Sequence, residues 1–196
     1  RGAMNTILQL SKEEKQVVAW SSGNHAQAVA AAAKITGRKA TIIMPKDSPK
    51  TKLDGTAFWG ASIITYDRTS ESREQIGREY AQKLNATIIP PYDDINVITG
   101  QGTTGLECTE QLTDIGVIPD IVLCCCGGGG LIAGVGSIVK YLSPKTKIIG
   151  VEPADAACMA AAFEKNRRVV LGHVGIFADG VAVKEVGKRT FELCDE

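Results

Sequence analysis

The chain has 196 residues, enough to bury one sizeable core or two small lobes without disulfides or metals. Lysine plus arginine equal aspartate plus glutamate at 22 each, so no net charge attracts nucleic acid or an anionic membrane. Apolar stretches are interrupted well before about 18 residues, which excludes a membrane-spanning helix. We therefore expect a small-molecule substrate, with neither nucleic acid nor membrane as a partner.

The six cysteines include no C-x-x-C pair and no zinc-like spacing with histidine, which favours a reducing compartment. Three of them, Cys124–Cys126, lie on an expected buried strand, and we expect them to pack as small hydrophobic side chains. No signal sequence is visible. We expect a cytoplasmic protein, or a mitochondrial or plastid one if a transit peptide has been lost upstream.

Strand and helix patterns alternate along the chain, which predicts an α/β fold with mainly parallel sheets flanked by helices. An opening helix is expected to run to about Leu10. Strands are expected at 17–20, 40–44, 62–66, 86–89, 120–123 and 147–151, with helices between them. The helix after Ser72 carries a capping-box pair with Gln75, which predicts where that helix begins.

The first strand leads into the turn Ser21-Ser22-Gly23-Asn24-His25, and an alanine-rich helix follows. In one interpretation a serine caps the helix and His25 is an ordinary turn residue. In the other, the N–H groups of Gly23, Asn24 and His25 bind a carboxylate, and the Asn24 amide bonds a second polar ligand atom. The turn alone leaves both interpretations open.

A break between two lobes is expected at Pro90-Pro91-Tyr92-Asp93-Asp94, because two prolines end a strand and an acidic turn follows. This predicts a small domain at 17–93, which carries the Ser21–His25 loop. Residues 1–16 and 94–196 would then form part of a large domain. Ligands of open α/β sheets bind beyond the carboxyl ends of strands, so the two glycine-bearing loops could face one cleft.

The most informative stretch is Gly127-Gly128-Gly129-Gly130, which joins an apolar strand directly to an apolar helix. Glycines let backbone N–H groups close on an anion, and a helix N-terminus adds roughly half a positive charge. The stretch therefore predicts a phosphate cradle.

One alternative for this cradle is a dinucleotide site. Residues 128–133 satisfy G-x-G-x-x-A, and Glu152 follows at the end of the next strand, where a ribose-binding acid belongs. Such fingerprints normally lie in the first βαβ unit of a domain, whereas this one follows four expected strands. An NAD-dependent oxidoreductase thus remains an alternative, and so does a non-catalytic binding fragment.

Several motifs, in this order, resemble the fold-type II pyridoxal-phosphate enzymes, which have a two-lobed architecture like that of tryptophan synthase β. The resemblance is closest to the threonine/serine dehydratases, with serine racemase as a near relative, and it covers essentially the whole chain. The motifs lie at 1–3, 22–27, 44–45, 90–93, 100–103, 127–131, 149–153 and 177–183.

The resemblance implies a role for each matching residue. The cofactor, pyridoxal 5'-phosphate, would have its phosphate held by the backbone amides of Gly127, Gly128, Gly129, Gly130 and Leu131, and its phenolic oxygen hydrogen-bonded by Asn24. The substrate carboxylate would be bound by Ser21, Ser22, Gly23 and His25, with Gln101 completing the contact. Gln101 is equally well interpreted as an amide that stabilises a loop.

In the resembled family the Schiff-base lysine lies two residues before the arginine that corresponds to Arg1. We therefore expect this chain by itself to be catalytically inert. Four lysines, Lys34, Lys46, Lys50 and Lys52, have polar or charged neighbours, and we expect them to be solvated.

The resemblance implies that the full-length protein catalyses β-elimination of L-threonine or L-serine to 2-oxobutanoate or pyruvate and ammonia, as in isoleucine biosynthesis, and that it is a homo-oligomer. Serine racemase remains an alternative because Ser22 matches the serine that racemases use as a base. The racemase metal site would use Glu152 and Ala156, but Cys158 stands where its aspartate belongs, so a hard oxygen site lacks a ligand. Asp155 could partly replace that aspartate.

Overall fold

The computed structural model describes residues 1–195 and divides the chain into two compact units. The first unit is Ala3–Pro91, and the second combines Arg1–Gly2 with the chain from Tyr92 onward. Residues 3–15, which we expected in the large domain, belong to the first unit because Ala3 and Ile7 pack into its core. The chain passes from one unit to the other between Pro91 and Tyr92.

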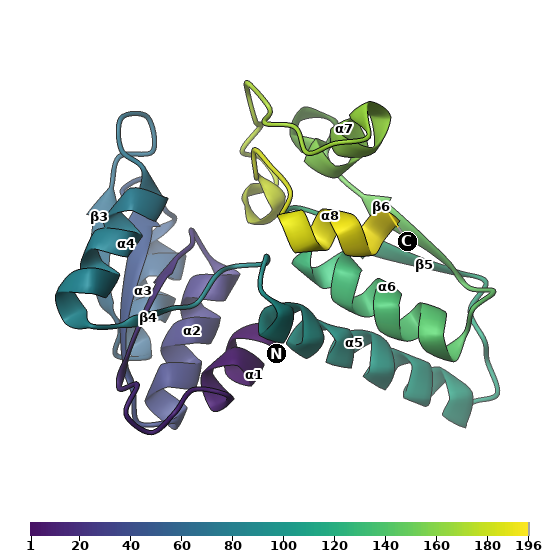
Figure 1. Ribbon diagram of the computed structural model, residues 1–196, viewed down its shortest axis with the longest axis horizontal. Coiled ribbons are helices and arrows are strands. Elements are labelled where there is room, and N and C mark those ends of the chain that lie inside the picture. The colour runs from purple at the N-terminus through teal and green to yellow at the C-terminus, as the bar shows by residue number, and fades with distance from the viewer. Residues whose placement is uncertain (196) are drawn as a thin grey trace. The chain divides into compact units, whose positions relative to one another are not determined.

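The first unit contains a parallel four-stranded sheet in the order β3-β2-β1-β4. Figure 1 labels its two edge strands, β3 and β4. Its strands are β1 (Gln16–Trp20), β2 (Lys39–Pro45), β3 (Ser62–Tyr66) and β4 (Thr87–Ile88), and its helices are α1 (Gly2–Leu8), α2 (Asn24–Ile35), α3 (Lys50–Phe58) and α4 (Arg73–Leu84). The opening helix ends earlier than expected. Ser72 caps α4 as expected, since its hydroxyl accepts the Gln75 N–H at 3.3 Å.

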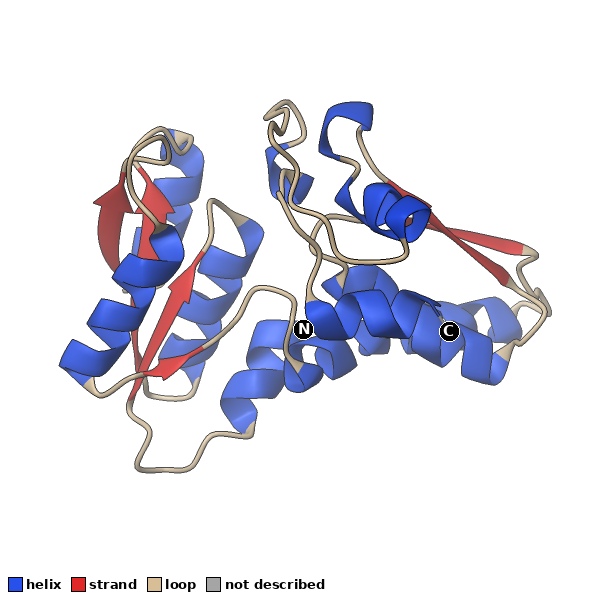
Figure 2. Cartoon of the chain, turned by 45° about the horizontal axis from the view of Figure 1, so that its top comes forward, coloured by secondary structure: helices blue, strands red, loops and turns tan. Residues whose placement is uncertain are grey.

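Alternation along β1 places its side chains on two faces of this sheet, as a period of two requires. Val17 and Ala19 pack in one core with residues of α1 and α2, whereas Val18 and Trp20 pack in a second core with residues of α4. Figure 2 shows the strands lying between helices. The buried strands follow from their long apolar runs, which are typical of parallel sheets covered on both faces.

The second unit contains a smaller parallel sheet made of β5 (Ile121–Cys125) and β6 (Lys147–Val151). Its α-helices are α5 (Ile95–Asp114), α6 (Gly130–Leu142), α7 (Cys158–Lys165) and α8 (Lys188–Asp195), and two 3-10 helices lie at Ala154–Ala156 and Asp179–Val181. The expected α/β class with parallel sheets and flanking helices is confirmed.

The cysteine run is only partly buried, which corrects the sequence expectation. Cys124 and Cys126 lie in the core of the second unit, whereas Cys125 is exposed. Ile121 and Leu123 are also exposed, at 50% and 69%. Residues 121, 123 and 125 share the face of β5 opposite to its core-facing residues, so alternation and not composition decides which cysteines are buried.

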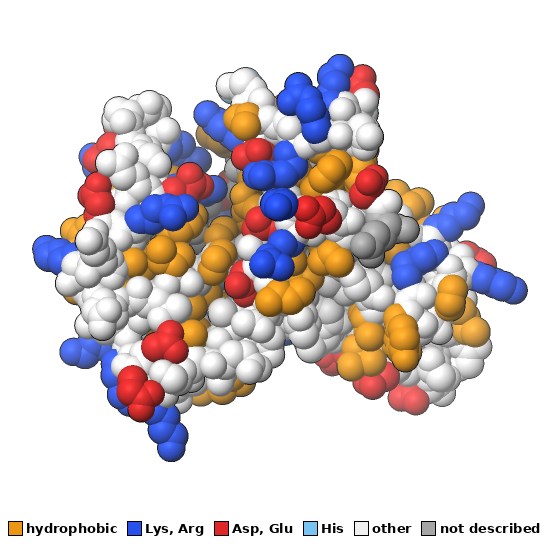
Figure 3. All heavy atoms as spheres, in the orientation of Figure 1, with side chains coloured by type: hydrophobic (Ala, Val, Ile, Leu, Met, Phe, Trp, Pro, Cys, Tyr) orange, Lys and Arg blue, Asp and Glu red, His pale blue; other side chains and the backbone are white. Residues whose placement is uncertain are grey.

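Charged side chains of both signs are interspersed on the face of each unit shown in Figure 3. This distribution matches the equal numbers of basic and acidic residues in the chain. In the part of the chain that the structure describes, no helix is both long and apolar enough to cross a bilayer.

Two helix-interior glycines differ in the space beside them, which predicts opposite effects of substitution. A Cβ on Gly77 of α4 would lie 2.4 Å from a ring carbon of buried Trp20, whereas a Cβ on Gly136 of α6 would lie no closer than 3.8 Å to Ile148. We expect Gly77→Ala to lower the free energy of unfolding by about 1–3 kcal/mol through overpacking. Gly136→Ala should raise it by up to about 1 kcal/mol through helix propensity.

Urea denaturation followed by circular dichroism measures both changes. Gly136→Ala is the control for helix propensity. A Gly77→Ala variant as stable as the wild type would contradict the close packing of α4 on Trp20.

Candidate functional site

The loop Ser21–His25 joins β1 to α2 and presents backbone N–H groups at the helix start. The N-cap is Gly23 and no side chain caps the helix, so the interpretation in which a serine caps α2 is wrong. Instead, the Ser21 hydroxyl accepts the Gly23 N–H at 3.2 Å and stabilises the turn itself. Ser22 is half-buried and Asn24 is exposed, so both side chains are reachable from solvent. The first-turn N–H groups of α2 lack intrahelical acceptors, as at any helix start.

His25 connects this loop to Ile89, the residue that follows the strand β4. Its Nε2 donates to the Ile89 carbonyl at 3.0 Å. Burial lowers the pKa of His25 to about 4, so the ring is neutral near pH 7. The imidazole therefore anchors the start of α2 and adds no positive charge to the loop.

The charge that lies at this loop comes from Lys52 of α3. A Cβ added to Gly23 would lie 3.1 Å from Lys52 Nζ, so the ammonium group lies directly against the turn. Lys52 is half-buried, in contrast to the exposed Lys34, Lys46 and Lys50. Our expectation that all four lysines are solvated is therefore wrong for Lys52. The sequence shows no local signal for this contact because the lysine lies on a separate helix.

The glycine loop after β5 adopts a shape that side chains would prevent. Gly129 has φ of +94°, a left-handed conformation that glycine adopts without steric cost. A Cβ on Gly128 would lie 2.3 Å from the Tyr92 ring. A Cβ on Gly129 would lie 2.7 Å from Thr190 and 2.9 Å from Met159. The loop is thus a tightly enclosed backbone segment.

The N–H groups of this loop suit an anion. The first helical bond of α6 is donated by Ala133 to the Gly129 carbonyl at 2.9 Å, so the preceding N–H groups have no intrahelical acceptor. The helix that follows has 13 residues, which gives it a full dipole whose positive end lies at the loop. Gly127–Leu131 therefore meets the requirements of the expected phosphate cradle.

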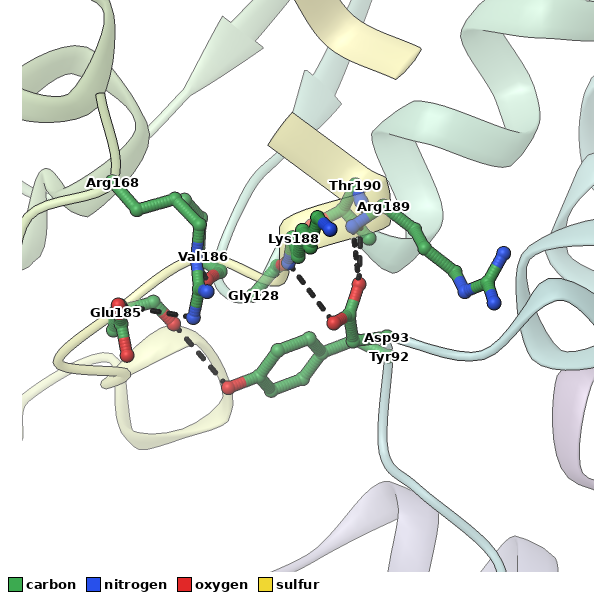
Figure 4. Close-up of polar contacts among 9 residues, drawn as sticks. All are labelled: Tyr92, Asp93, Gly128, Arg168, Glu185, Val186, Lys188, Arg189 and Thr190. Atoms are coloured by element: carbon green, nitrogen blue, oxygen red, sulfur yellow. Dashed lines mark hydrogen bonds and ion pairs between the residues drawn. The ribbon is translucent and has the colours of Figure 1, made fainter. Parts of the chain in front are cut away.

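The Gly128 carbonyl points to α8 and accepts two hydrogen bonds. The Thr190 hydroxyl donates to it at 2.7 Å, and the Gly187 N–H donates at 3.1 Å. Figure 4 shows Thr190 beside Gly128 at the start of α8. These contacts were missed by the sequence analysis, since Thr190 lies 62 residues from Gly128.

Asp93 caps α8 and was expected only as part of an acidic turn. Its carboxylate accepts the N–H groups of Lys188 at 2.9 Å, Arg189 at 2.8 Å and Thr190 at 3.3 Å (Figure 4). The neighbouring Tyr92 hydroxyl donates to the Glu185 carbonyl at 3.3 Å. Two consecutive residues at the start of the second unit therefore hold the segment that contacts the glycine loop.

Gln101 lies within α5 and not in a loop. Its Oε1 accepts the Gly2 N–H at 2.9 Å, which is a structural role for the amide. A carboxylate at this residue would therefore have to bind the Nε2 group. Gln101 can therefore have both expected roles only if its Oε1 stabilises the structure and its Nε2 binds the substrate.

Glu152 has a structural role in place of the metal-binding one considered above. Its two carboxylate oxygens accept the N–H groups of Met159 and Ala160, each at 2.9 Å, and thereby cap α7. The Cys158 thiol points to the Gly127 carbonyl at 3.4 Å. Among residues 1–195, no group of three His, Cys, Asp or Glu side chains is placed to hold a metal ion.

Four thiols of the second unit, three of them buried and that of Cys194 half-buried, are poor nucleophiles. Burial raises the pKa of Cys124, Cys158 and Cys194 to about 11 each, and raises the pKa of Cys126 further. The thiolate is the reactive form of cysteine, so these residues act as packing groups near neutral pH.

The low pKa of His25 predicts a pH dependence of stability. Because the folded pKa of about 4 lies below the ordinary value of 6.5, the neutral ring stabilises the fold fully above pH 6.5. This stabilisation should be lost as the pH falls towards 4, by about 3 kcal/mol in total. Urea denaturation at a series of pH values measures it. His25→Gln should remove this component, whereas the exposed His173→Gln should keep it; identical profiles for wild type and His25→Gln would refute the assignment.

Comparisons with known proteins identify the family of the chain. The family model described as "Pyridoxal-phosphate dependent enzyme" matches residues 1–196. A biosynthetic L-threonine dehydratase of Haemophilus influenzae is 43% identical over the whole chain, which covers 38% of that relative. Other similar proteins are named as chloroplastic or mitochondrial threonine dehydratases.

Solved structures of pyridoxal-phosphate enzymes also resemble this chain. The processed threonine deaminase isoform 2 of Solanum lycopersicum matches with a TM-score of 0.91 and 44% identity, over the whole chain and 57% of that protein's chain. Maize serine racemase matches with a TM-score of 0.91 and 36% identity, over 98% of this chain and 57% of its own. The family match replaces the dinucleotide interpretation of residues 128–133. The chain spans little more than half of these structures, and it belongs to the pyridoxal-phosphate dependent enzyme family.

Proposed function

We propose that this chain is the part of an amino-acid ammonia-lyase that binds the phosphate of pyridoxal 5'-phosphate and the carboxylate of the substrate. The whole protein would convert L-threonine or L-serine to 2-oxobutanoate or pyruvate and ammonia. The observation that carries the proposal is the glycine loop, whose enclosed backbone and unpaired first-turn N–H groups suit a phosphate. The second unit would accordingly belong to a larger cofactor-binding domain.

The residues present fit the cofactor. Gly127, Gly128, Gly129, Gly130 and Leu131 would hold the phosphate through their N–H groups, and a side chain on Gly128 would collide with Tyr92. Asn24 is exposed and would donate to the phenolic oxygen. When bound, pyridoxal phosphate supplies the electron sink that makes removal of the Cα proton feasible.

The first loop would bind and orient the substrate. The backbone N–H of His25 would donate to the α-carboxylate, with the hydroxyls of Ser21 and Ser22 beside it. Gly23 would shape the turn, since its own N–H already donates to the Ser21 hydroxyl. Fixing the carboxylate limits rotation of the substrate and helps to align its Cα–H bond. Gln101 would add its Nε2 donor, since its Oε1 already accepts the Gly2 N–H.

A racemase is the second candidate, and Ser22 favours it. The half-buried hydroxyl of Ser22 lies in the substrate loop, where it would move a proton at the substrate Cα. The 36% identity to maize serine racemase supports the same alternative. Elimination remains our choice because the sequence similarity to threonine dehydratases is higher.

The products distinguish these two functions. We expect the complete protein, loaded with pyridoxal phosphate, to form 2-oxobutanoate from L-threonine and pyruvate from L-serine. Chiral chromatography of the serine reaction gives the control. Formation of D-serine faster than pyruvate would overturn elimination in favour of racemisation.

Lys52 should strengthen binding of the substrate carboxylate, because its ammonium group lies against Gly23. We expect Lys52→Met in the complete holoenzyme to raise KM for the amino acid about tenfold with little change in kcat. Lys50→Met, on the same helix but exposed and ion-paired with Asp54, is the matched control and should leave KM unchanged. Equal KM values in the two variants would show that Lys52 does not act on the substrate.

The proposal extends to the cellular location and the oligomeric state of the protein. We propose a plastid or mitochondrial location if a transit peptide precedes this sequence, and a cytoplasmic one otherwise. A homo-oligomeric state of the complete enzyme is likewise part of the proposal.

A further inference from the structure

We propose that Thr190 is a positioning residue for cofactor binding and that Asp93 holds it in place through α8. The inference rests on the proposed function, since it concerns how the glycine loop is kept ready for a phosphate. Neither residue would touch the phosphate. Both would act through the conformation of the loop.

The first step of the argument is the peptide plane between Gly128 and Gly129. A trans peptide is planar, so its C=O and N–H groups point in opposite directions. The Gly128 carbonyl accepts the Thr190 hydroxyl at 2.7 Å and the Gly187 N–H at 3.1 Å. These bonds direct the carbonyl to α8 and thereby direct the Gly129 N–H away from α8. The same plane orientation accompanies the left-handed conformation of Gly129.

The second step is the burial of Thr190. Its side chain is fully buried, with 0% exposed. A valine of nearly the same shape would fill the same volume without a hydroxyl. The buried hydroxyl is paired because it donates to the Gly128 carbonyl. Without the hydroxyl, that carbonyl would accept only the hydrogen bond from the Gly187 N–H.

The third step is the attachment of α8. Asp93 accepts three N–H groups in the first turn of the helix, which places Thr190 in register with the loop. Arg168 supports the preceding segment, with Nε donating to the Val186 carbonyl at 3.0 Å and a 3.0 Å ion pair to Glu185 (Figure 4). The glycine loop is therefore held through side chains from three distant parts of the second unit.

The chain offers a matched control for the Thr190 hydroxyl. Thr146 is 1% exposed, and its hydroxyl donates to the Pro119 carbonyl at the same distance, 2.7 Å. Thr146 precedes β6, whereas the glycine loop follows the parallel strand β5, so the two threonines lie at opposite ends of this sheet. Thr146→Val thus removes an equivalent buried bond away from the loop.

The binding experiment compares pyridoxamine 5'-phosphate with pyridoxamine, because neither needs a lysine to bind. Fluorescence titration of the complete protein, freed of pyridoxal phosphate, should show that Thr190→Val weakens binding of the phosphate ester about tenfold. Binding of pyridoxamine should be unchanged. Thr190→Ser should restore the affinity, and Thr146→Val should keep it while losing stability. Equal phosphate-ester affinity in Thr190→Val and wild type would overturn the inference.

A second measurement needs no ligand. Amide hydrogen exchange of residues 128–131 should speed up in Thr190→Val but not in Thr146→Val, because only the first variant releases the Gly128 carbonyl. Unchanged exchange in Thr190→Val would also overturn the inference. If the complete wild-type protein, freed of pyridoxal phosphate, fails to bind pyridoxamine 5'-phosphate, the proposed function is refuted, and exchange still decides whether Thr190 positions the loop.

Discussion

The carbonyl oxygen of Gly128 connects the glycine loop to the rest of its unit. Through Thr190 and Gly187 it joins the loop to α8, and through Asp93 the helix is joined to the segment where the chain enters the unit. Asp94, the next residue, caps α5 with hydrogen bonds to Asn96 and Val97 at 2.9 and 3.1 Å. Two consecutive carboxylates, Asp93 and Asp94, therefore fix the first turns of two helices, which gives the acidic turn after the prolines a structural role.

The loops at 21–25 and 127–130 both present backbone N–H groups at a helix start, but their surroundings differ. Each follows a parallel strand and begins a helix, so each presents unpaired backbone N–H groups at a positive helix end. The loop at 127–130 achieves this with consecutive glycines enclosed by larger side chains. The loop at 21–25 has one glycine and a neutral histidine, and its charge is supplied by Lys52 from α3. In the proposed function the loop at 127–130 would bind a phosphate and the loop at 21–25 a carboxylate.

Burial rather than chemical type decides what several reactive residues do. Cys124 and Cys126 lie in the core, where their thiols stay protonated, whereas Cys125 on the same strand is exposed. Glu152 uses both carboxylate oxygens to cap α7. Cysteine and glutamate are typical metal ligands or nucleophiles, but the contacts of these residues in the fold give them structural roles.

Local patterns in the sequence were enough to predict the parallel α/β class, most strands to within two residues, the cap at Ser72 and the glycine loop between a strand and a helix, because each depends on residues close together in the chain. Phosphate binding by this loop stays a prediction. The motifs also indicated the family that the comparisons confirm. The contacts of Lys52 with Gly23, of Thr190 with Gly128 and of Asp93 with α8 were decided by the tertiary structure alone. They join residues that are 29 to 97 positions apart, and over such separations no periodicity or spacing rule indicates which side chains meet.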